Sequence, residues 1–320
     1  MTERRFEITV PRRKNRERLD AYLTREIPEL SRNRIQKLIR ENRVTVNGLT
    51  ARPNRPVLPA DVIVVSVPKP PPQDIRPETI PLDIVYEDGH LMVVNKPAGM
   101  VVHPACGHFS GTLVNALLGY TTDLAGGSGP ERSGIVHRLD KGTSGLLVVA
   151  RTETAHAALA LQFEEKSVER EYRALLWGNL PQSSGTVETL LNRSVRDRRR
   201  IAVASRGKHA VTHYRTLERF HFLSHVSLRL ETGRTHQIRV HMAHLGHPVF
   251  GDPEYGGRTP KGLSRPESAL AEEMLEGIMR QALHAKTLGF LHPATGERMR
   301  FDSELPEDIV KVLDRLKQEG

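Results

Sequence analysis

A short charged loop carries the first residues whose types and spacing suit catalysis. Arg138 and Lys141 flank Asp140, and glycines follow before an apolar run at 145–150. The glycines predict a tight loop and the apolar run predicts a buried strand, so rigid structure would hold Asp140 in place, as it holds many catalytic residues. The two cations favour an ionised carboxylate, which can act as a nucleophile or as a general base. Taken alone, the same pattern also fits a surface ion pair.

A second dense segment lies at 231–248. Arg234, His236 and Arg239 fall there, at a predicted transition from a strand to a helix. The first amide groups of a helix point outward and favour anionic ligands. These polar and cationic groups therefore form the second part of a candidate site.

The modules that position these segments are separated by prolines. A proline-rich stretch at 68–81 interrupts all periodicity and predicts a semi-rigid linker. Before it we expect a basic tail at 1–15 and a small module at 16–67, and after it a large module at 82–320.

The large module mixes strands and helices without a regular alternation. Strands are expected at 84–88, 91–97, 145–150, 170–177, 225–232 and 286–291, and helices at 112–118, after Thr154 and over 270–278. This order favours an α+β fold with a mixed, largely antiparallel sheet over a doubly wound parallel sheet. Trp177 is expected in the core, and the role of residues 258–280 stays open.

The small module is expected to contain two helices followed by strands at 44–46 and 61–67. Ser31 is a predicted N-cap for the second helix, whose apolar side includes Ile35 and Leu38. Cations line the opposite side of this helix: Arg32, Arg34, Lys37, Arg40 and Arg43.

Positive charge is concentrated in one fifth of the chain. The 320 residues carry 47 Lys+Arg and 38 Asp+Glu, a formal net charge of +9. Residues 1–66 hold 15 of the Lys/Arg and 8 of the Asp/Glu, and so carry +7 of this excess. A basic block on a small domain indicates a polyphosphate partner, and a solvated basic face is the alternative.

The composition predicts a globular, cytoplasmic protein. Apolar runs such as 145–150 are far shorter than the roughly 20 residues that span a bilayer. The first residues are charged and contain no apolar signal core. A lone Cys106 excludes an internal disulfide, favours a reducing compartment, and is expected to be a small packed residue.

The small module resembles an S4 RNA-binding domain over about residues 16–67. The resemblance rests on 18–23, on Ser31-Arg32 through Ile39, and on Val44-Thr45-Val46-Asn47-Gly48. The segments 41–43 and 60–61 depart from the family, which more often has glycine there. The resemblance implies that the cations of the second helix bind RNA phosphates without reading bases.

The large module resembles the RluA-type pseudouridine synthases over about residues 80–305. Two motifs carry most of the resemblance, His-Arg-Leu-Asp-Lys-Gly-Thr-Ser-Gly at 137–145 and Thr-Gly-Arg-Thr-His-Gln-Ile-Arg-Val-His at 232–241. Supporting motifs lie at 95–97, 103–104, 170–174, 283–285 and 292–297, and Arg170 stands where lysine is common. With the S4-like module in front, the chain resembles the RluD-like branch, which acts on large-subunit ribosomal RNA.

The resemblance implies roles for individual residues. Asp140 matches the catalytic aspartate, and Arg239 matches the basic residue that pairs with it. Tyr172 matches the tyrosine that stacks on the target base and assists proton removal from C5. Arg138 matches the arginine that occupies the space left by the flipped base. Further RNA contacts are expected from the neighbours of these residues: His137, Arg234, His236 and Ile238.

Two other clusters of basic residues allow more than one interpretation. His236, His241, His244 and His247 have spacings that suit a metal, but contacts to RNA or internal hydrogen bonds are favoured because no cysteine accompanies them. The expected reaction is redox-neutral and needs neither metal nor organic cofactor. A second basic patch, which we call the arginine loop, is expected to follow phosphates, with a solvated loop as the alternative: Arg196, Arg198, Arg199, Arg200, Arg206 and Lys208.

The implied reaction breaks the bond from N1 to C1′ of a uridine, turns the uracil and joins it through C5. A carboxylate would either trap C1′ or remove the C2′ proton, and a base inside a stack must first be flipped out, at a cost of a few kcal/mol. We expect a monomer that acts on ribosomal RNA, free or within an assembling large subunit. The alternatives are a ribosome-associated RNA-binding protein without catalysis and a synthase of the same chemistry acting on transfer RNA.

Overall fold

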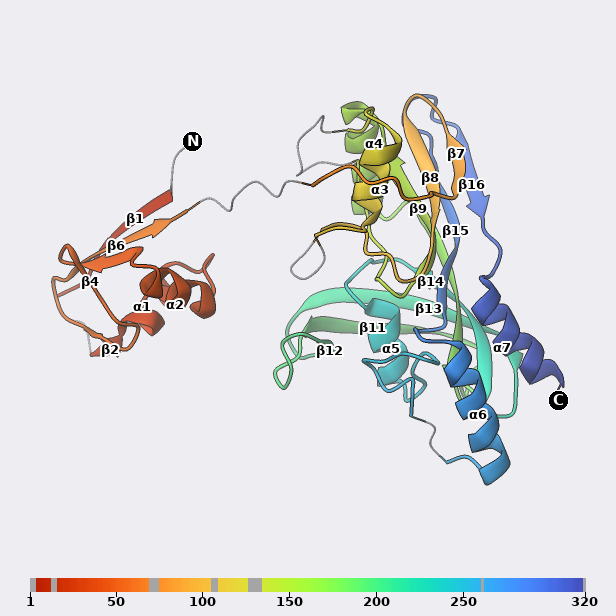
Figure 1. The fold of residues 1–320 in the computed structure, drawn as a ribbon. Helices are drawn as coiled ribbons and strands as arrows, with labels where there is room; N and C mark the ends of the chain where they lie inside the picture. Colours follow the sequence, from red (N-terminus) through yellow and green to blue (C-terminus); the bar gives the residue numbers. More distant parts are fainter. Residues whose placement is uncertain are drawn as a thin grey trace. The chain divides into compact units, whose positions relative to one another are not determined.

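The computed structural model describes residues 4–12, 16–68, 75–104, 109–125, 134–259 and 262–318. They belong to two compact units, Met1–Gln73 and Asp74–Gly320, and each is described by itself (Figure 1). The division between the units falls within the proline-rich stretch, and Cys106 lies outside the described residues. None of the described helices combines the length and the apolar character that a membrane span requires.

The small unit packs two helices against a four-stranded antiparallel sheet of order β1-β6-β3-β4, and a short β2-β5 pair completes it. Its elements are β1 (Arg4–Thr9), β2 (Glu17–Arg18), α1 (Leu19–Glu26), α2 (Arg32–Arg40), β3 (Val44–Val46), β4 (Leu49–Thr50), β5 (Pro56–Val57) and β6 (Val62–Val67). Ser31 caps α2 as predicted, because its side chain accepts a hydrogen bond from the amide of Arg34 at 3.3 Å. The apolar face of α2, which includes Ile35 and Leu38, is fully buried.

The prediction of a tail at 1–15 is wrong for Arg4–Thr9, which form β1 antiparallel to β6. Phe6 and Ile8 alternate with polar residues and pack against the core, and Val10 is buried. The surrounding charges obscured this alternation, which is the signature of a half-buried strand.

The two departures from the glycines of the S4 family retain the backbone conformation that glycine favours. Asn42 has φ +56° and Ala60 has φ +66°. Asparagine tolerates this left-handed region because its short side chain bonds locally, whereas alanine adopts it only under steric strain. The turns therefore keep their shape with different residues.

A buried carboxylate stabilises the small unit. Asp20 in α1 is fully buried and accepts hydrogen bonds from the Nε of Arg18, the Nη2 of Arg32 and the Nε2 of Gln36 at 3.1, 3.0 and 2.6 Å. Burial by itself raises the pKa of Asp20, but the hydrogen bonds outweigh burial and lower the pKa to about 2. Since the folded pKa lies below the ordinary 3.8, this stabilisation is present above pH 3.8 and is lost as the pH falls through about 2.

We therefore expect Asp20→Asn to lower the free energy of unfolding of the small unit by about 2 kcal/mol at pH 7. Amide hydrogen exchange of peptides from this unit, measured in the intact chain, reports the change. Glu41→Gln is a matched control, because Glu41 is exposed and its contact with Lys37 is 3.6 Å long. Equal protection in the Asp20→Asn variant and the wild type would contradict the prediction.

The large unit is built on a ten-stranded, largely antiparallel sheet. Nine strands follow the order β12-β11-β13-β14-β10-β15-β9-β8-β7, and β16 pairs with β15. The β15-β9 pair is parallel. The strands are β7 (Ile84–Glu87), β8 (Leu91–Lys96), β9 (Ser144–Ala150), β10 (Glu169–Trp177), β11 (Ser184–Arg193), β12 (Ile201–Val203), β13 (Lys208–Arg219), β14 (Leu223–Leu230), β15 (Leu283–Leu291) and β16 (Arg298–Asp302). The predicted α+β class with a mixed, largely antiparallel sheet is confirmed.

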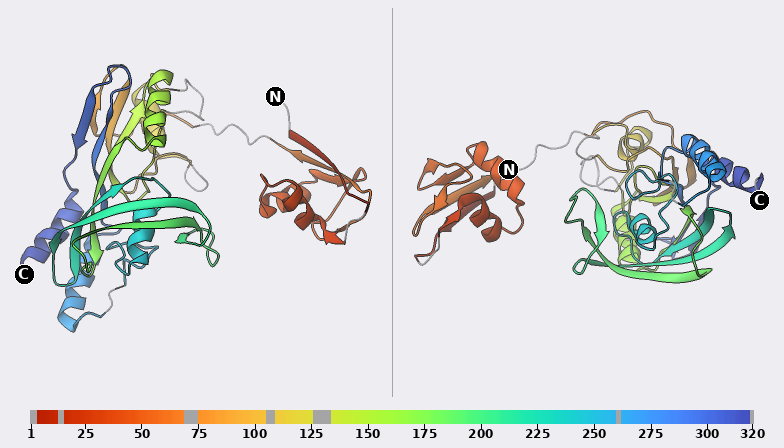
Figure 2. Two further views of the ribbon diagram at one scale, coloured as in Figure 1. Left: turned by 180° about the vertical axis from the view of Figure 1, so that it is seen from behind. Right: turned by 90° about the horizontal axis from the view of Figure 1, so that it is seen from below.

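Helices cover this sheet in separate places. The helices are α3 (Leu113–Tyr120), α4 (Glu153–Glu164), α5 (Gln237–His244), α6 (Arg265–Gly277) and α7 (Glu307–Gln318). Helix α5 lies within the curve of β11 to β13, α4 lies against β9 and β15, and α6 contacts α7 (Figures 1 and 2). The main core lies between these helices and the sheet, and it includes Trp177 as predicted. The expected helix over 270–278 is part of α6.

Candidate functional site

The eight residues predicted as functional in the large module meet at one cavity. The cavity has a volume of about 290 Å³ and is lined by segments from β10, α5 and the two loops that carry the sequence motifs. The predicted residues among its walls are His137, Arg138, Asp140, Tyr172, Arg234, His236, Ile238 and Arg239. Segments 100 residues apart in the sequence are therefore neighbours at this site.

The loop that carries Asp140 is held from several sides. The amide of Thr143 donates to the carbonyl of Asp140 at 3.0 Å and closes a turn. Next along the chain, Gly145 has φ +116°, and a Cβ there would lie 2.2 Å from the carbonyl oxygen of Ala285. Only glycine allows β9 to approach β15 this closely, because a side chain at this position would clash with the backbone of β15.

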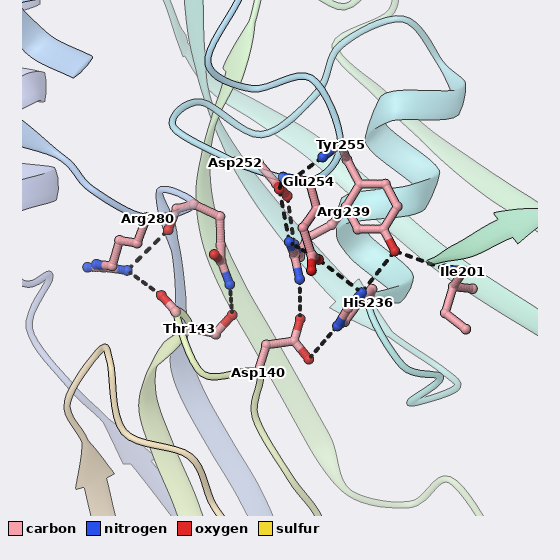
Figure 3. A network of polar contacts seen from close by, with 11 residues as sticks. Asp140, Thr143, Ile201, His236, Arg239, Asp252, Glu254, Tyr255 and Arg280 are labelled. Atoms are coloured by element: carbon pink, nitrogen blue, oxygen red, sulfur yellow. Dashed lines mark hydrogen bonds and ion pairs between the residues drawn. The ribbon is translucent and has the colours of Figure 1, made fainter. Parts of the chain in front are cut away.

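The segment 258–280 contributes to the same loop. The Nη1 of Arg280 donates to the carbonyl of Gly142 at 3.1 Å, and the Nε2 of Gln281 donates to the Oγ1 of Thr143 at 3.1 Å (Figure 3). Arg280 is in turn bound to both oxygens of Asp308 at 2.7 Å. The sequence left the role of this segment open. In the structure its last residue, Arg280, supports the loop of Asp140 by a hydrogen bond.

Arg239 links Asp140 to a buried carboxylate. Its Nη1 donates to the Oδ2 of Asp140 at 3.2 Å, its Nε and Nη2 bind Asp252 at 2.6 and 2.9 Å, and its Nη2 also reaches Glu254 at 2.7 Å (Figure 3). Burial opposes the charge of Arg239, but the three carboxylates outweigh burial and raise the pKa of its guanidinium above the ordinary value. Arg239 therefore presents a permanent, fixed cation to Asp140, as the sequence pattern predicts.

His236 lies between Asp140 and Glu254. Its Nε2 lies 3.8 Å from the Oδ1 of Asp140, and its Nδ1 lies 3.5 Å from the Oε2 of Glu254 and 2.8 Å from the Oη of Tyr255 (Figure 3). The Oη of Tyr255 also accepts a hydrogen bond from the amide of Ile201 at 3.1 Å, and burial raises the pKa of Tyr255. His236 occupies the N-cap of α5 with φ +55°, a strained backbone conformation of the kind found at functional sites.

Flat and apolar side chains form the inner wall of the cavity. Tyr172 is 8% exposed and Ile238 is 4% exposed. The rings of His137 and Phe163 stack with centroids 4.4 Å apart. Burial raises the pKa of Tyr172, so its phenol is neutral at physiological pH. Burial and the charge of Arg170 lower the pKa of His137 to about 3, and its Nε2 accepts the amide proton of Val148 at 3.0 Å, so this ring is neutral as well.

Two of the cations that line the cavity are exposed and form its rim. Arg138 and Arg234 are exposed, and the Nε of Arg234 donates to the carbonyl of His209 at 3.1 Å. The arginine loop joins β11 to β12 and β13, and Asp197 binds Arg199 and Arg200 within it. In the small unit, the predicted cations are Arg32, Arg34, Lys37 and Arg40 on α2, and Arg32 is bound to Asp20 as described above.

The histidines of the second motif do not converge on one point. His241 bonds to Thr189 and Thr212, whereas His247 bonds to the carbonyl of Trp177. Among the described residues, no group of three or more His, Cys, Asp or Glu side chains has an arrangement that would hold a metal ion.

Several cavity and support residues were not predicted from the sequence. Lys96 is fully buried, its Nζ donates to the carbonyls of Pro97 and Met100 at 2.7 and 2.9 Å, and burial and the charge of Arg280 lower its pKa to about 7 despite the charge of Asp140. The remaining residues of this kind are Phe163, Arg170, Asp252, Glu254, Tyr255 and Arg280. Lys96 and Arg170 lie within sequence motifs, but no local pattern distinguishes a buried support residue from an exposed one.

Comparisons with known proteins identify the family to which each unit is similar. The RNA pseudouridylate synthase family matches residues 90–244, and the S4 domain matches residues 17–63. The ribosomal large subunit pseudouridine synthase D of Xylella fastidiosa is 47% identical, with 98% of this chain and 93% of that protein covered. The protein of the same name from Pseudomonas aeruginosa is 46% identical, with 95% and 93% covered.

Two further relatives extend the comparison. The uncharacterised RNA pseudouridine synthase YlyB of Bacillus subtilis is 43% identical, with 98% of this chain and 99% of that protein covered. The solved structure of human RNA pseudouridylate synthase domain containing 4 has a TM-score of 0.56 and 26% identity, with 73% of this chain and 92% of that chain covered. Since similarity extends over nearly the whole length of the bacterial relatives, this chain belongs to the RNA pseudouridylate synthase family.

Proposed function

We propose that this protein converts uridine to pseudouridine in large-subunit ribosomal RNA, with Asp140 as the catalytic carboxylate. The observation that carries the proposal is the contact of Asp140 with the buried cation of Arg239 at 3.2 Å, inside a cavity with Tyr172 in its wall. The choice of RNA is supported by two bacterial relatives named ribosomal large subunit pseudouridine synthase D.

The reaction uses the cavity as follows. The target uridine leaves its stack, and its uracil enters the cavity beside Tyr172 and Ile238. The exposed guanidinium of Arg138 at the rim fills the space that the base leaves in the RNA. These contacts offset the cost of a few kcal/mol for flipping the base.

Asp140 then acts on the sugar. Its carboxylate either attacks C1′ or removes the proton from C2′, and either route breaks the bond between N1 and C1′. Arg239 holds the carboxylate toward the substrate through its contact at 3.2 Å. Because the neutral phenol of Tyr172 is a poor base, we assign Tyr172 to stacking and leave removal of the C5 proton to another group.

The decisive measurement is the release of tritium from C5-labelled uridine in ribosomal RNA. We expect release by the wild-type protein, and no release would overturn the proposal. Release from labelled transfer RNA but not from ribosomal RNA would mean that the protein carries out the same reaction on transfer RNA. Mapping modified positions in total RNA from a deletion strain identifies the uridines.

We further propose that the small unit supplies RNA affinity. We expect the triple variant Arg34→Gln/Lys37→Gln/Arg40→Gln to bind RNA more weakly and to reduce the slope of log affinity against log salt by about 2–3, because each cation releases roughly one counterion. The rate at saturating RNA should stay unchanged. Filter binding at several salt concentrations measures the slope, and Lys311→Gln/Lys317→Gln on α7 is the control. An unchanged slope in the triple variant would contradict this assignment.

We also propose that the protein is a monomer that acts in the cytoplasm on ribosomal RNA, either free or within an assembling large subunit. Sedimentation of the purified protein tests the first part, and sedimentation as a dimer would refute it. Modification rates of naked ribosomal RNA and of precursor particles, measured under the same conditions, identify which form is the substrate.

A further inference from the structure

Arg170 differs from the other buried arginines of the structure. Among the described residues, three arginines are at least nine-tenths buried: Arg170, Arg239 and Arg280. Arg239 and Arg280 each bind carboxylates at 2.6 to 3.2 Å. Within the same part of the chain Arg170 forms no ion pair, its Nη2 has only long contacts with the carbonyls of Leu230 and Glu231 at 3.4 and 3.3 Å, and its Nε is buried without an acceptor.

An uncompensated buried cation is costly, because burial removes the water that stabilises its charge. Burial accordingly lowers the pKa of Arg170. A ligand that supplies the missing acceptor would offset this cost. Arg170 lines the cavity of Asp140, where a bound substrate can supply such an acceptor, and it also lines a second cavity beside Glu231 and Arg298.

The surroundings of Arg170 indicate which part of the substrate it meets. Its guanidinium lies over the ring of Phe163 at 5.6 Å, and Phe163 stacks on His137. Tyr172 follows two residues later on the same face of β10, and both side chains are buried. Flat rings of this kind accommodate a base, whereas the cations suited to phosphates, Arg138 and Arg234, are exposed at the rim.

We propose that Arg170 is a catalytic residue that donates hydrogen bonds to a carbonyl oxygen of the target uracil and stabilises the negative charge of the leaving base. The inference rests on the proposed function. When the N1–C1′ bond breaks, its electron pair stays with the uracil, which becomes an anion with charge on N1, O2 and O4. The charge develops whether Asp140 attacks C1′ or removes the C2′ proton. The charge disappears when C5 joins C1′: in the first route the bond from C1′ to Asp140 then breaks, and in the second route C2′ takes back its proton from Asp140. The C5 proton then leaves and N1 takes up a proton.

This role requires that the cation be in place before the charge appears. A donor fixed in a water-poor site stabilises a developing charge without reorganising, and removing one such donor slows other enzymes by about 10²–10³-fold. The guanidinium is buried beside the carbonyls of Leu230 and Glu231 and over the ring of Phe163, while Nε and Nη1 lack an acceptor among the described residues.

The test compares Arg170→Gln, Arg170→Met and Arg170→Lys with the wild type in single turnover. The substrate is the shortest ribosomal RNA fragment that the wild type modifies, made with uridine or 5-fluorouridine at the modified position. The loss of the starting nucleoside is measured after digestion for both substrates, because 5-fluorouridine carries no C5 proton to release. We expect Arg170→Gln and Arg170→Met to lower the rate by about 10²–10³-fold with less than a threefold change in Kd, and Arg170→Lys to retain part of the rate. Arg298→Gln is the control, because Arg298 is exposed and lies outside the cavity of Asp140.

The fluorinated substrate distinguishes charge stabilisation from other roles. Fluorine withdraws electrons and stabilises the uracil anion, so the loss caused by Arg170→Gln should be smaller on 5-fluorouridine than on uridine. An equal loss on both substrates would overturn the inference. A raised Kd with a flatter salt slope and an unchanged saturating rate would also overturn it, since Arg170 would then bind phosphate.

Thermal unfolding separates this role from a structural one. Methionine keeps an unbranched apolar side chain and removes the uncompensated charge, so the Tm of Arg170→Met should be unchanged or raised. A Tm several degrees lower would assign Arg170 to the support of the fold and overturn the inference. If the wild type converts neither substrate, the proposed function fails as well, whereas an active wild type with equally active variants refutes only the role of Arg170.

Discussion

Replacing Asp140 with asparagine is expected to lower tritium release from C5-labelled ribosomal RNA by about 10³-fold or more. Asparagine retains the size of the side chain but lacks the charge needed to attack C1′ or to remove the C2′ proton. RNA affinity should change less than about twofold, because the rim cations and α2 are untouched. Single-turnover release and filter binding measure the two quantities.

The fold should tolerate this substitution. The side chain of Asp140 is 19% exposed, and Arg239 keeps its contacts with Asp252 and Glu254. Asp314→Asn, on the exposed side of α7, serves as the control and should be fully active. If Asp140→Asn retained a tenth of the wild-type rate, another group would have to be the catalytic carboxylate.

Replacing Arg239 with methionine is expected to lower the free energy of unfolding of the large unit by about 3–5 kcal/mol. Asp252 is fully buried and receives two charged hydrogen bonds from Arg239, so the substitution leaves a buried charge without a cation. Urea unfolding followed by the fluorescence of Trp177, the single tryptophan, measures the loss. Activity should fall as well, because Asp140 loses its cation.

Two further variants identify the cause of this loss. Adding Asp252→Asn to Arg239→Met should recover part of the stability, because it removes the unpaired charge. Lys311→Met breaks an exposed ion pair with Glu307 and should cost less than about 1 kcal/mol. If Arg239→Met unfolded at the same urea concentration as the wild type, the buried network would not stabilise this unit.

Arg239 and Arg170 make opposite predictions from the same substitution to methionine. Arg239 is surrounded by carboxylates, and its loss leaves their negative charges without a cation in the interior, so stability falls. Arg170 forms no ion pair with a carboxylate of the described residues. Its loss should therefore leave stability unchanged and lower the rate. The difference follows from the partners of each guanidinium, since both side chains are buried.

Features that depend on a few consecutive residues were predictable. The N-cap at Ser31 and the buried strand after Asp140 follow from short-range hydrogen bonding and from apolar periodicity, which act within one or two turns of chain. Strand β1 was missed because only its inner face is apolar, and the charges on its outer face resemble those of a tail.

The partners of the catalytic groups could not be predicted in the same way. Asp252 lies thirteen residues after Arg239, and Arg280 lies 138 residues after Gly142. Whether such residues meet depends on how β9, β15 and α5 pack, and most pairs of residues with these sequence separations are not in contact. Burial decides further whether a charge requires a partner, and burial is a property of the assembled core.

The sequence by itself determined which residues are chemically able to act: a carboxylate between cations, a motif rich in arginine and histidine, and a basic helix for RNA. Those properties reside in side-chain types and their local spacing. Only the tertiary structure decided that three carboxylates surround Arg239 while none pairs with Arg170, and that His236 lies between Asp140 and Glu254. The physical reason is that the charge balance of a buried group depends on its distances to other charges across the cavity, and many of those charges belong to residues that are remote in the sequence.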